Sequence, residues 1–164
     1  MKEYTVYFTV GAPGSGKTRW SKSIQSKYTV GYVLRTSRDD LRTTLYGDNY
    51  FKGYDDSYSK FEDVLVETQL NIIKTAIQND SSKIYIIDNA NCHIPTLDHM
   101  IKTIKSWNND DIKITIRIQS FIHVPLSVCK YQNRDRTRIV PEDILLDIYD
   151  RMNGVEKWII QNNL

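Results

Sequence analysis

The sequence has few of the features that mark secreted, cysteine-metal or membrane proteins. It contains only two cysteines, Cys92 and Cys129, and neither lies in a CxxC or Cys/His spacing. This argues against a disulfide framework and against a cysteine metal site. No apolar run approaches the roughly 20 residues of a membrane span. The first residues also lack the basic segment and cleavage site of a signal peptide. We therefore expect a cytoplasmic protein with no membrane partner.

An excess of charge of one sign is also missing. The 22 Lys and Arg residues nearly balance the 20 Asp and Glu residues, so any surface for nucleic acid must be local. Hydrophobic residues make up 40% and charged residues 26% of the chain, near globular averages, which argues against disorder and against a coiled coil. A length of 164 residues suits one domain with a real core, which we place at residues 1–164.

Strand-like and helix-like segments alternate along the chain, a pattern typical of a parallel sheet covered by helices. The expected strands are residues 4–10, 31–34, 84–87 and 112–123. The expected helices are residues 17–28, 37–46, 61–76, 95–107, 126–133, 141–152 and 155–161. Residues 47–60 combine Gly, Asp and Asn with four aromatic residues, so we expect a long loop or lid there. The predicted fold class is α/β, with a central parallel sheet and helices on both faces.

A glycine-rich octet follows the first expected strand and precedes the first expected helix. Its residues are Gly11, Ala12, Pro13, Gly14, Ser15, Gly16, Lys17 and Thr18. It matches G-x-x-x-x-G-K-[ST] at every fixed position, and this context is that of a P-loop. Backbone N–H groups of a P-loop point at the phosphates of a nucleoside triphosphate, and the helix dipole adds positive potential. We therefore expect the octet to bind ATP, with Lys17 on the outer phosphates and Thr18 on Mg²⁺.

A carboxylate, Asp88, directly follows the buried strand expected at residues 84–87. In P-loop proteins a carboxylate at this place helps to hold the metal ion. Aspartate at a strand end is also a common turn former. The metal role of Asp88 therefore depends on its pairing with the P-loop.

The acceptor of a phosphoryl group should bind near RTSRDDLR, residues 35–42, because this segment follows the second expected strand at the ligand-binding edge of the sheet. Asp39 and Arg42 are three residues apart on the expected helix and share a face. A carboxylate would repel a phosphate acceptor, but it can take the proton of a hydroxyl acceptor. We therefore predict Asp39 as general base, with Arg42 and Arg38 on the acceptor. Alternatively, the acids only stabilise the start of the helix.

A second basic cluster, KYQNRDRTR, occupies residues 130–138. Such a run is usually a solvated face. In a P-loop kinase, however, an arginine from a late segment can stabilise the charge of the transferring group. Only one or two of these arginines need to take this role.

Together these motifs resemble the kinase domain of bacteriophage-type polynucleotide 5′-hydroxyl kinases, from residue 4 to about residue 152. The resemblance rests on GAPGSGKTRW, SRDDLR, IIDNAN and VPLSVCKYQNRDRTRIVP. It implies a P-loop kinase fold, ATP and Mg²⁺, and a DNA or RNA 5′ end as acceptor. It is also compatible with a phage-encoded enzyme acting in the host cytoplasm. The roles it implies are Lys17 and Thr18 on ATP and Mg²⁺, Asp39 as general base, Arg42 on the acceptor's 3′-phosphate, and Arg136 as the lid arginine.

The sequence departs from the family pattern at two places. The family's D-x-T-N signature is DNAN here, so either Asp88 or Asn89 would face the acceptor. The arginine segment is about one residue shorter, which makes Arg134 a rival to Arg136 as an ATP-binding residue. The D-x-D-x-T motif of the phosphatase domain found in some members is absent. Alternative functions are a kinase for a nucleoside, a nucleotide or a hydroxymethylated base, or a nucleotide-binding module without catalysis.

Overall fold

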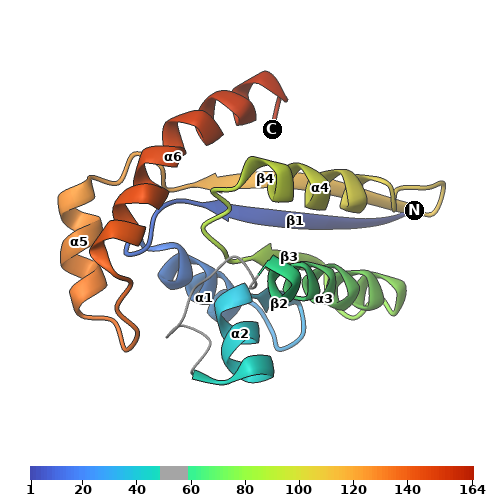
Figure 1. The fold of residues 1–164 in the computed structure, drawn as a ribbon. Coiled ribbons are helices and arrows are strands. Elements are labelled where there is room, and N and C mark those ends of the chain that lie inside the picture. The colour runs from blue at the N-terminus through green and yellow to red at the C-terminus, as the bar shows by residue number, and fades with distance from the viewer. Residues whose placement is uncertain (49–58) are drawn as a thin grey trace.

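The computed structural model describes residues 1–48 and 59–164, and Figure 1 shows a sheet flanked by helices. The strands are β1 (Lys2–Val10), β2 (Val33–Thr36), β3 (Ile84–Ile87) and β4 (Ile112–Ser120). The helices are α1 (Lys17–Lys27), α2 (Arg38–Tyr46), α3 (Ser59–Gln78), α4 (Ile94–Lys105), α5 (Leu126–Arg134) and α6 (Glu142–Gln161). Nearly all of the lid expected at residues 47–60 lies outside the described residues.

The sheet has the strand order β2-β3-β1-β4, and every neighbouring pair is parallel. The carboxyl ends of all four strands therefore lie at one edge. The chain passes from β1 to the edge strand β2, returns to β3, which lies between those two, and then crosses to β4 on the other side of β1. The direction of the connections therefore changes between β1 and β3. Ligands of open parallel sheets bind outside such a point. The octet follows β1 and Asp88 follows β3, so the topology brings these two motifs together.

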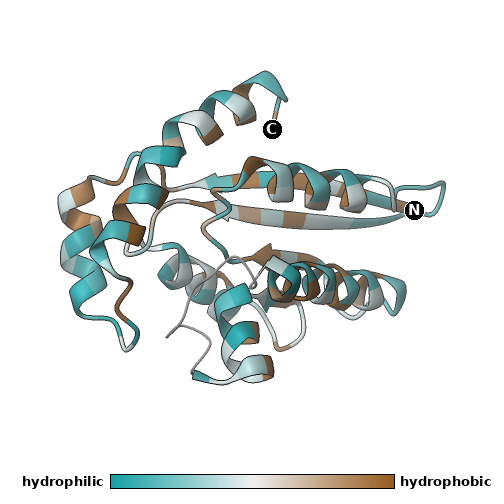
Figure 2. Ribbon diagram, in the orientation of Figure 1, coloured by the Kyte–Doolittle hydropathy of each residue, from teal (hydrophilic) through white to brown (hydrophobic). Residues whose placement is uncertain are grey.

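Helices cover both faces of the sheet, as predicted. On β1, alternate residues Tyr4, Val6 and Phe8 are buried in a core shared with α3, α4 and the end of α6. On the opposite face the Tyr7 ring contacts the Trp20 ring of α1, with centroids 5.6 Å apart. This alternation follows from the twofold period of a strand. Apolar residues recur along the strands and along one side of the helices (Figure 2).

Several predicted boundaries differ from the structure by one or two residues, and three elements were wrong in ways that have a physical reason. The strand expected at residues 31–34 is Val33–Thr36, because Gly31 has a φ of 87° and belongs to the turn before it. The strand expected at residues 112–123 ends at Ser120. The helices expected at residues 141–152 and 155–161 are one helix, α6. Gly154 lies inside α6 and costs it about 1 kcal/mol relative to alanine. The buried side chains Met152, Val155 and Ile159 continue across that glycine and outweigh its cost.

In the part of the chain that the structure describes, no helix is both long and apolar enough to cross a bilayer.

Candidate active site

The octet forms a tight loop between β1 and α1. Gly14 and Gly16 have φ values of 79° and 97°, a region that favours glycine. The Lys17 ammonium lies inside the loop, where Nζ donates hydrogen bonds to the Ala12 carbonyl at 2.7 Å and to Ser15 Oγ at 3.5 Å. Thr18 stands in the first turn of α1 and is exposed. The loop therefore has the closed shape of a phosphate cradle, with its cation turned inward.

Helix α5 packs directly on this loop at Gly14. A Cβ atom at Gly14 would lie 2.2 Å from the carbonyl oxygen of Cys129 and 3.2 Å from the backbone nitrogen of Asn133. The first distance is far below any normal contact, so only glycine fits here. The loop and α5 therefore keep a fixed relative position.

Replacing Gly14 by alanine is expected to lower both the melting temperature and the affinity for nucleotide. The added Cβ meets backbone atoms of α5, and a positive φ strains any side chain. Thermal unfolding and nucleotide titration measure the two effects. Gly154→Ala is the matched control, because nothing lies within 4 Å of its Cβ position and a helical glycine-to-alanine change is stabilising. Unchanged melting and nucleotide affinity in Gly14→Ala would contradict the packing described here.

Asp88 is held from one side by an arginine of the neighbouring strand. Arg35 Nε and Nη2 both donate to Asp88 Oδ2, at 2.7 and 2.6 Å, and Nη1 donates to Asp40 at 2.9 Å. The Asp88 side chain is 1% exposed. Its other oxygen, Oδ1, is buried and has no hydrogen-bond partner among the described residues. A buried charged oxygen without a partner is costly, so this atom is suited to a ligand.

A magnesium site fits the chemistry around this oxygen. Mg²⁺ prefers oxygen ligands and is held by one or two protein groups together with phosphates and water. The carboxylate of Asp88 and the hydroxyl of Thr18 are donors of this kind. Within residues 1–48 and 59–164 no group of three or more His, Cys, Asp or Glu side chains could hold a metal ion alone.

The carboxylate of Asp39 is bound by two arginines from different parts of the chain. Arg42 Nη1 donates to Oδ1 at 2.6 Å, and Arg138 Nη2 pairs with Oδ2 at 2.5 Å. Burial alone would raise the pKa of Asp39, but the positive charges of Arg42, Arg138 and Arg136 outweigh it and the pKa is lowered. Asp39 is therefore an ionised carboxylate at neutral pH.

The remaining donors of Arg42 face an acid that the sequence did not single out. Nε and Nη2 donate to the two oxygens of Glu62 on α3, at 2.7 and 2.5 Å. This is the two-pronged geometry in which a guanidinium also binds a phosphate. Arg42 thus presents an anion-binding edge that Glu62 occupies.

Asn89 is turned into the protein rather than toward the loop. Its Nδ2 donates to Gln69, whose own Nε2 donates to Thr36, and its Oδ1 accepts from the backbone N–H of Arg38. This buried network joins β2, β3, α2 and α3. Of the two residues proposed to face the acceptor, Asp88 is therefore the one whose side chain has an oxygen without a hydrogen-bond partner among the described residues.

The Arg38 side chain is part-buried, and its Nε is buried with no hydrogen-bond partner in the part of the chain that is described. Burial, with the nearby charge of Arg42, lowers the pKa of Arg38. This donor is suited to an anion that enters beside α2.

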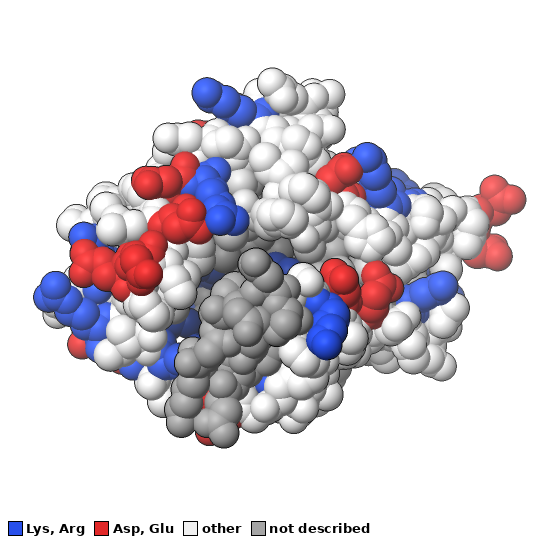
Figure 3. Space-filling view, viewed as in Figure 1, with Lys and Arg blue, Asp and Glu red and all other residues white. Residues whose placement is uncertain are grey.

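The segment after α5 brings two arginines to the same place. Arg138 contacts Asp39, and Arg136 is close enough to lower the pKa of both Lys17 and Asp39. Arg134 is exposed and acts instead on Glu142 at the start of α6. In Figure 3 acidic side chains line α6, and basic ones gather beside them over α5 and the loop that follows. Of the two arginines Arg134 and Arg136, Arg136 is the one whose charge affects Lys17 and Asp39.

Comparison with known proteins places this arrangement in a family. Residues 6–155 match the family model AAA_33, which is described as an AAA domain. The chain belongs to the AAA_33 family. Its fold is that of a P-loop kinase, as predicted, and the match does not single out the phage-type polynucleotide kinases within it.

Proteins similar to this AAA_33 domain include one curated relative and the following two solved structures. Adenylate kinase isoenzyme 1 of Cyprinus carpio is 37% identical over 91 residues, which are 54% of this chain and 46% of that protein. A chain of the Pnkp1/Rnl/Hen1 RNA repair complex superposes with a TM-score of 0.72 at 17% identity, covering 96% of this chain and 46% of that one. A fungal RNA kinase superposes with a TM-score of 0.52 at 11% identity, covering 99% and 62%. The chain thus spans about half the length of the first two.

Four charged groups of the AAA_33 domain act on one another electrostatically around the loop. The pKa of Lys17 is lowered to about 8, chiefly by burial and also by the positive charge of Arg136, while the charges of Asp88 and Asp39 act in the opposite direction. The predicted phosphate, metal, acceptor and lid residues therefore meet in one place. Sequence reasoning missed Arg35 and Glu62 and passed over Arg138. The one sequence signal for Arg35 and Arg138 was the positive charge of the segments RTSRDDLR and RDRTR that contain them.

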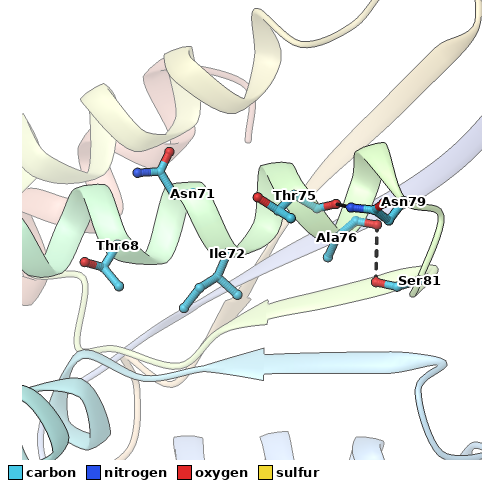
Figure 4. A pocket seen from close by; sticks show the side chains of 7 residues that line it. All are labelled: Thr68, Asn71, Ile72, Thr75, Ala76, Asn79 and Ser81. Atoms are coloured by element: carbon cyan, nitrogen blue, oxygen red, sulfur yellow. Dashed lines mark hydrogen bonds between the residues drawn. The ribbon is translucent and has the colours of Figure 1, made fainter.

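The AAA_33 domain also has a shallow groove of about 610 Å³ along the outer side of α3. Figure 4 shows its lining, in which Asn79 donates to the Thr75 carbonyl and Ser81 to the Ala76 carbonyl. It lies near the start of β3, at the opposite edge of the sheet from the P-loop. It contains none of the charged residues described above, so we assign it no role in phosphate chemistry.

Proposed function

We propose that this domain transfers the terminal phosphoryl group of ATP to the 5′-hydroxyl end of a polynucleotide, DNA or RNA. The observation that carries the proposal is the ionised carboxylate of Asp39, paired with Arg42 and close enough to Lys17 to affect its pKa. A carboxylate at this place serves a hydroxyl acceptor, because the hydroxyl must lose its proton during transfer. The likeness to an RNA kinase and to an RNA repair complex supports a nucleic-acid acceptor.

The nucleotide would bind in the loop of residues 11–18. Lys17 would exchange its hydrogen bond to the Ala12 carbonyl for contacts to the phosphates, and Arg136 would approach them from the segment after α5. Thr18 and Asp88 would hold Mg²⁺, which neutralises charge on the β- and γ-phosphates when bound. Arg35 holds Asp88 through Oδ2 and leaves Oδ1 without a protein partner among the described residues.

Asp39 would orient the acceptor hydroxyl and take its proton. Its two arginines hold the carboxylate in one position, so the geometry is set before the acceptor arrives. Arg42 would exchange Glu62 for the phosphate on the 3′ side of the acceptor sugar, and Arg38 would add its unpartnered donor to the same anion.

A second candidate is a kinase for a nucleotide or nucleoside. The 37% identity to adenylate kinase over 91 residues favours it. An acceptor screen with ATP, Mg²⁺ and labelled γ-phosphate separates the two. Label on 5′-hydroxyl oligonucleotides is expected, and faster transfer to free nucleosides or nucleotides would favour the second candidate. Hydrolysis that no acceptor changes would leave only a nucleotide-binding module.

Replacing Arg42 by alanine is expected to raise the KM of the acceptor by about tenfold or more and to leave the KM of ATP nearly unchanged, because a bidentate charged contact is lost on the acceptor side only. Steady-state kinetics with a nucleoside 3′-phosphate and with the matching nucleoside check the reason, since only the former should lose affinity. Arg117→Ala, an exposed arginine on β4, is the control. An equal effect on both substrates would instead place Arg42 at the triphosphate.

The affinity for ATP is expected to fall as the pH rises above about 8. Protonated Lys17 binds phosphate, and burial has lowered its pKa to about 8 in the free protein. Bound phosphate favours the protonated form, so a proton is taken up on binding above that pH. Titrations from pH 7 to 9.5 measure the slope. Lys17→Arg stays charged throughout and should show a flat profile, and an equal slope in both proteins would contradict this origin.

A further inference from the structure

The loop that carries Arg136 and Arg138 is closed at its base by one side chain. Asn133, the next-to-last residue of α5, donates from Nδ2 to the Val140 carbonyl at 2.8 Å and accepts from the Val140 N–H at 3.1 Å. We name residues 134–140 the arginine loop. The oxygen and the nitrogen of the side-chain amide thus both form hydrogen bonds with the backbone of Val140, as two paired residues of neighbouring strands do. Asn133 is 5% exposed, so water does not compete strongly for these bonds.

The same residue also touches the P-loop through its backbone. The Asn133 nitrogen lies 3.2 Å from the Cβ position of Gly14, and the Cys129 carbonyl lies even closer. The α5 backbone therefore rests on the P-loop while the Asn133 side chain holds the far end of the arginine loop. Lys130 of α5 also donates to Glu142 of α6 across this loop, but those side chains are 34% and 65% exposed, whereas Asn133 is buried.

The arginine loop has little else to fix its shape. Ile139 is 60% exposed, and Arg134 and Thr137 are exposed as well, so apolar packing contributes little. The pair between Arg138 and Asp39 is part-exposed, and such pairs are worth about 1 kcal/mol or less. Among these contacts the Asn133 bridge is the buried one, so it is suited to restrain where Arg136 and Arg138 point.

We propose that Asn133 is a positioning residue that fixes the arginine loop on the P-loop, and so directs Arg136 to the triphosphate and Arg138 to Asp39. For its kinetic consequences the proposal rests on the phosphoryl transfer proposed above. Its structural consequence, the position of the arginine loop in the free protein, does not depend on that function.

Limited trypsin digestion tests the structural consequence, since trypsin cleaves after arginine. Asn133→Ala should be cut in the arginine loop about fivefold faster or more than the wild type, because local opening controls cleavage. Asn133→Asp keeps the side-chain volume and the acceptor for the Val140 N–H, but it replaces the donor by a charged oxygen that repels the Val140 carbonyl, so it should also be cut faster. Asn108→Ala is the matched control: its amide bonds the backbone of Ile114 and Lys105 at the other end of the sheet. Equal cleavage in wild type and both Asn133 variants would overturn the proposal.

A double-mutant cycle tests the kinetic consequence. Asn133→Ala should lower kcat by about tenfold or more with a smaller change in KM, because a small misplacement of a transition-state group affects turnover. In an Arg136→Ala, Arg138→Ala background the same change should lower kcat by about twofold or less, because the two arginines that Asn133 positions are already absent. Fully additive losses would overturn the positioning role. If no acceptor is ever labelled, the proposed function fails, and the trypsin result still decides the role of Asn133.

Discussion

Replacing Lys17 by alanine is expected to abolish phosphoryl transfer and leave the fold intact. Removing one preorganised donor to a transferring group typically costs about 10²- to 10³-fold in kcat, and Lys17 is the cation at the centre of the loop. Its ammonium contacts Ala12 and Ser15 and no apolar core. Burial works against its charge, as the lowered pKa shows, so removing it should not lower the melting temperature.

The measurement is single-turnover transfer together with thermal unfolding. Lys22→Ala is the control, because Lys22 stands farther along α1 with an exposed side chain. Transfer that stays within about tenfold of wild type, a barrier change of about 1.4 kcal/mol, would show that residues 11–18 do not act as a phosphate cradle.

The P-loop and the α/β fold were predictable because their signals are local. Eight consecutive residues define the loop, and the strand before it and the helix after it follow from patterns of a few residues. Asp88 was predictable for the same reason, as the residue that ends a short buried strand. Alternating strands and helices then require a parallel sheet, whose carboxyl edge collects both motifs.

The partners of the predicted residues were not predictable, because they depend on pairing between distant segments. Arg35 reaches Asp88, 53 residues away, only because β2 lies beside β3 in a register that pairs Arg35 with Ile86. Arg42 meets Glu62 across the junction of α2 and α3. A charge in a sequence shows no partner until the register and the helix packing are known.

The choice between Arg134 and Arg136 shows the same limit. Both stand in one short basic run, and the run itself does not indicate which side of the loop faces the P-loop. In the proposal above the Asn133 bridge to Val140 sets that direction, and an asparagine before an arginine run carries no such signal in sequence. The continuity of α6 was missed for a related reason, since Gly154 weakens a helix locally and tertiary burial decides the outcome.

Replacing Asp39 by asparagine is expected to lower kcat by about 10²- to 10⁴-fold, the usual worth of general acid–base catalysis, with ATP affinity nearly unchanged. The amide keeps the size of the side chain but cannot accept the hydroxyl proton as a carboxylate does. It also loses the charge that pairs with Arg42 and Arg138, which are part-exposed contacts of modest strength. The lowered pKa of Asp39 means that its ion pairs stabilise the fold at neutral pH and are lost on acidification through that pKa.

The alternative role of Asp39 is that of an acid at a helix start, and it predicts a different pattern. Asp39 lies in the first turn of α2, where Ser37 already caps the helix. If this were its whole role, Asp39→Asn would cost about 0.5 to 2 kcal/mol of stability and leave turnover intact. Asp143→Asn gives the size of that effect, because Asp143 stands in the first turn of α6. Measuring kcat, nucleotide affinity and melting temperature on both variants separates the two roles. An Asp39 variant that loses only as much stability as the Asp143 variant, with normal kcat, would remove Asp39 from the reaction.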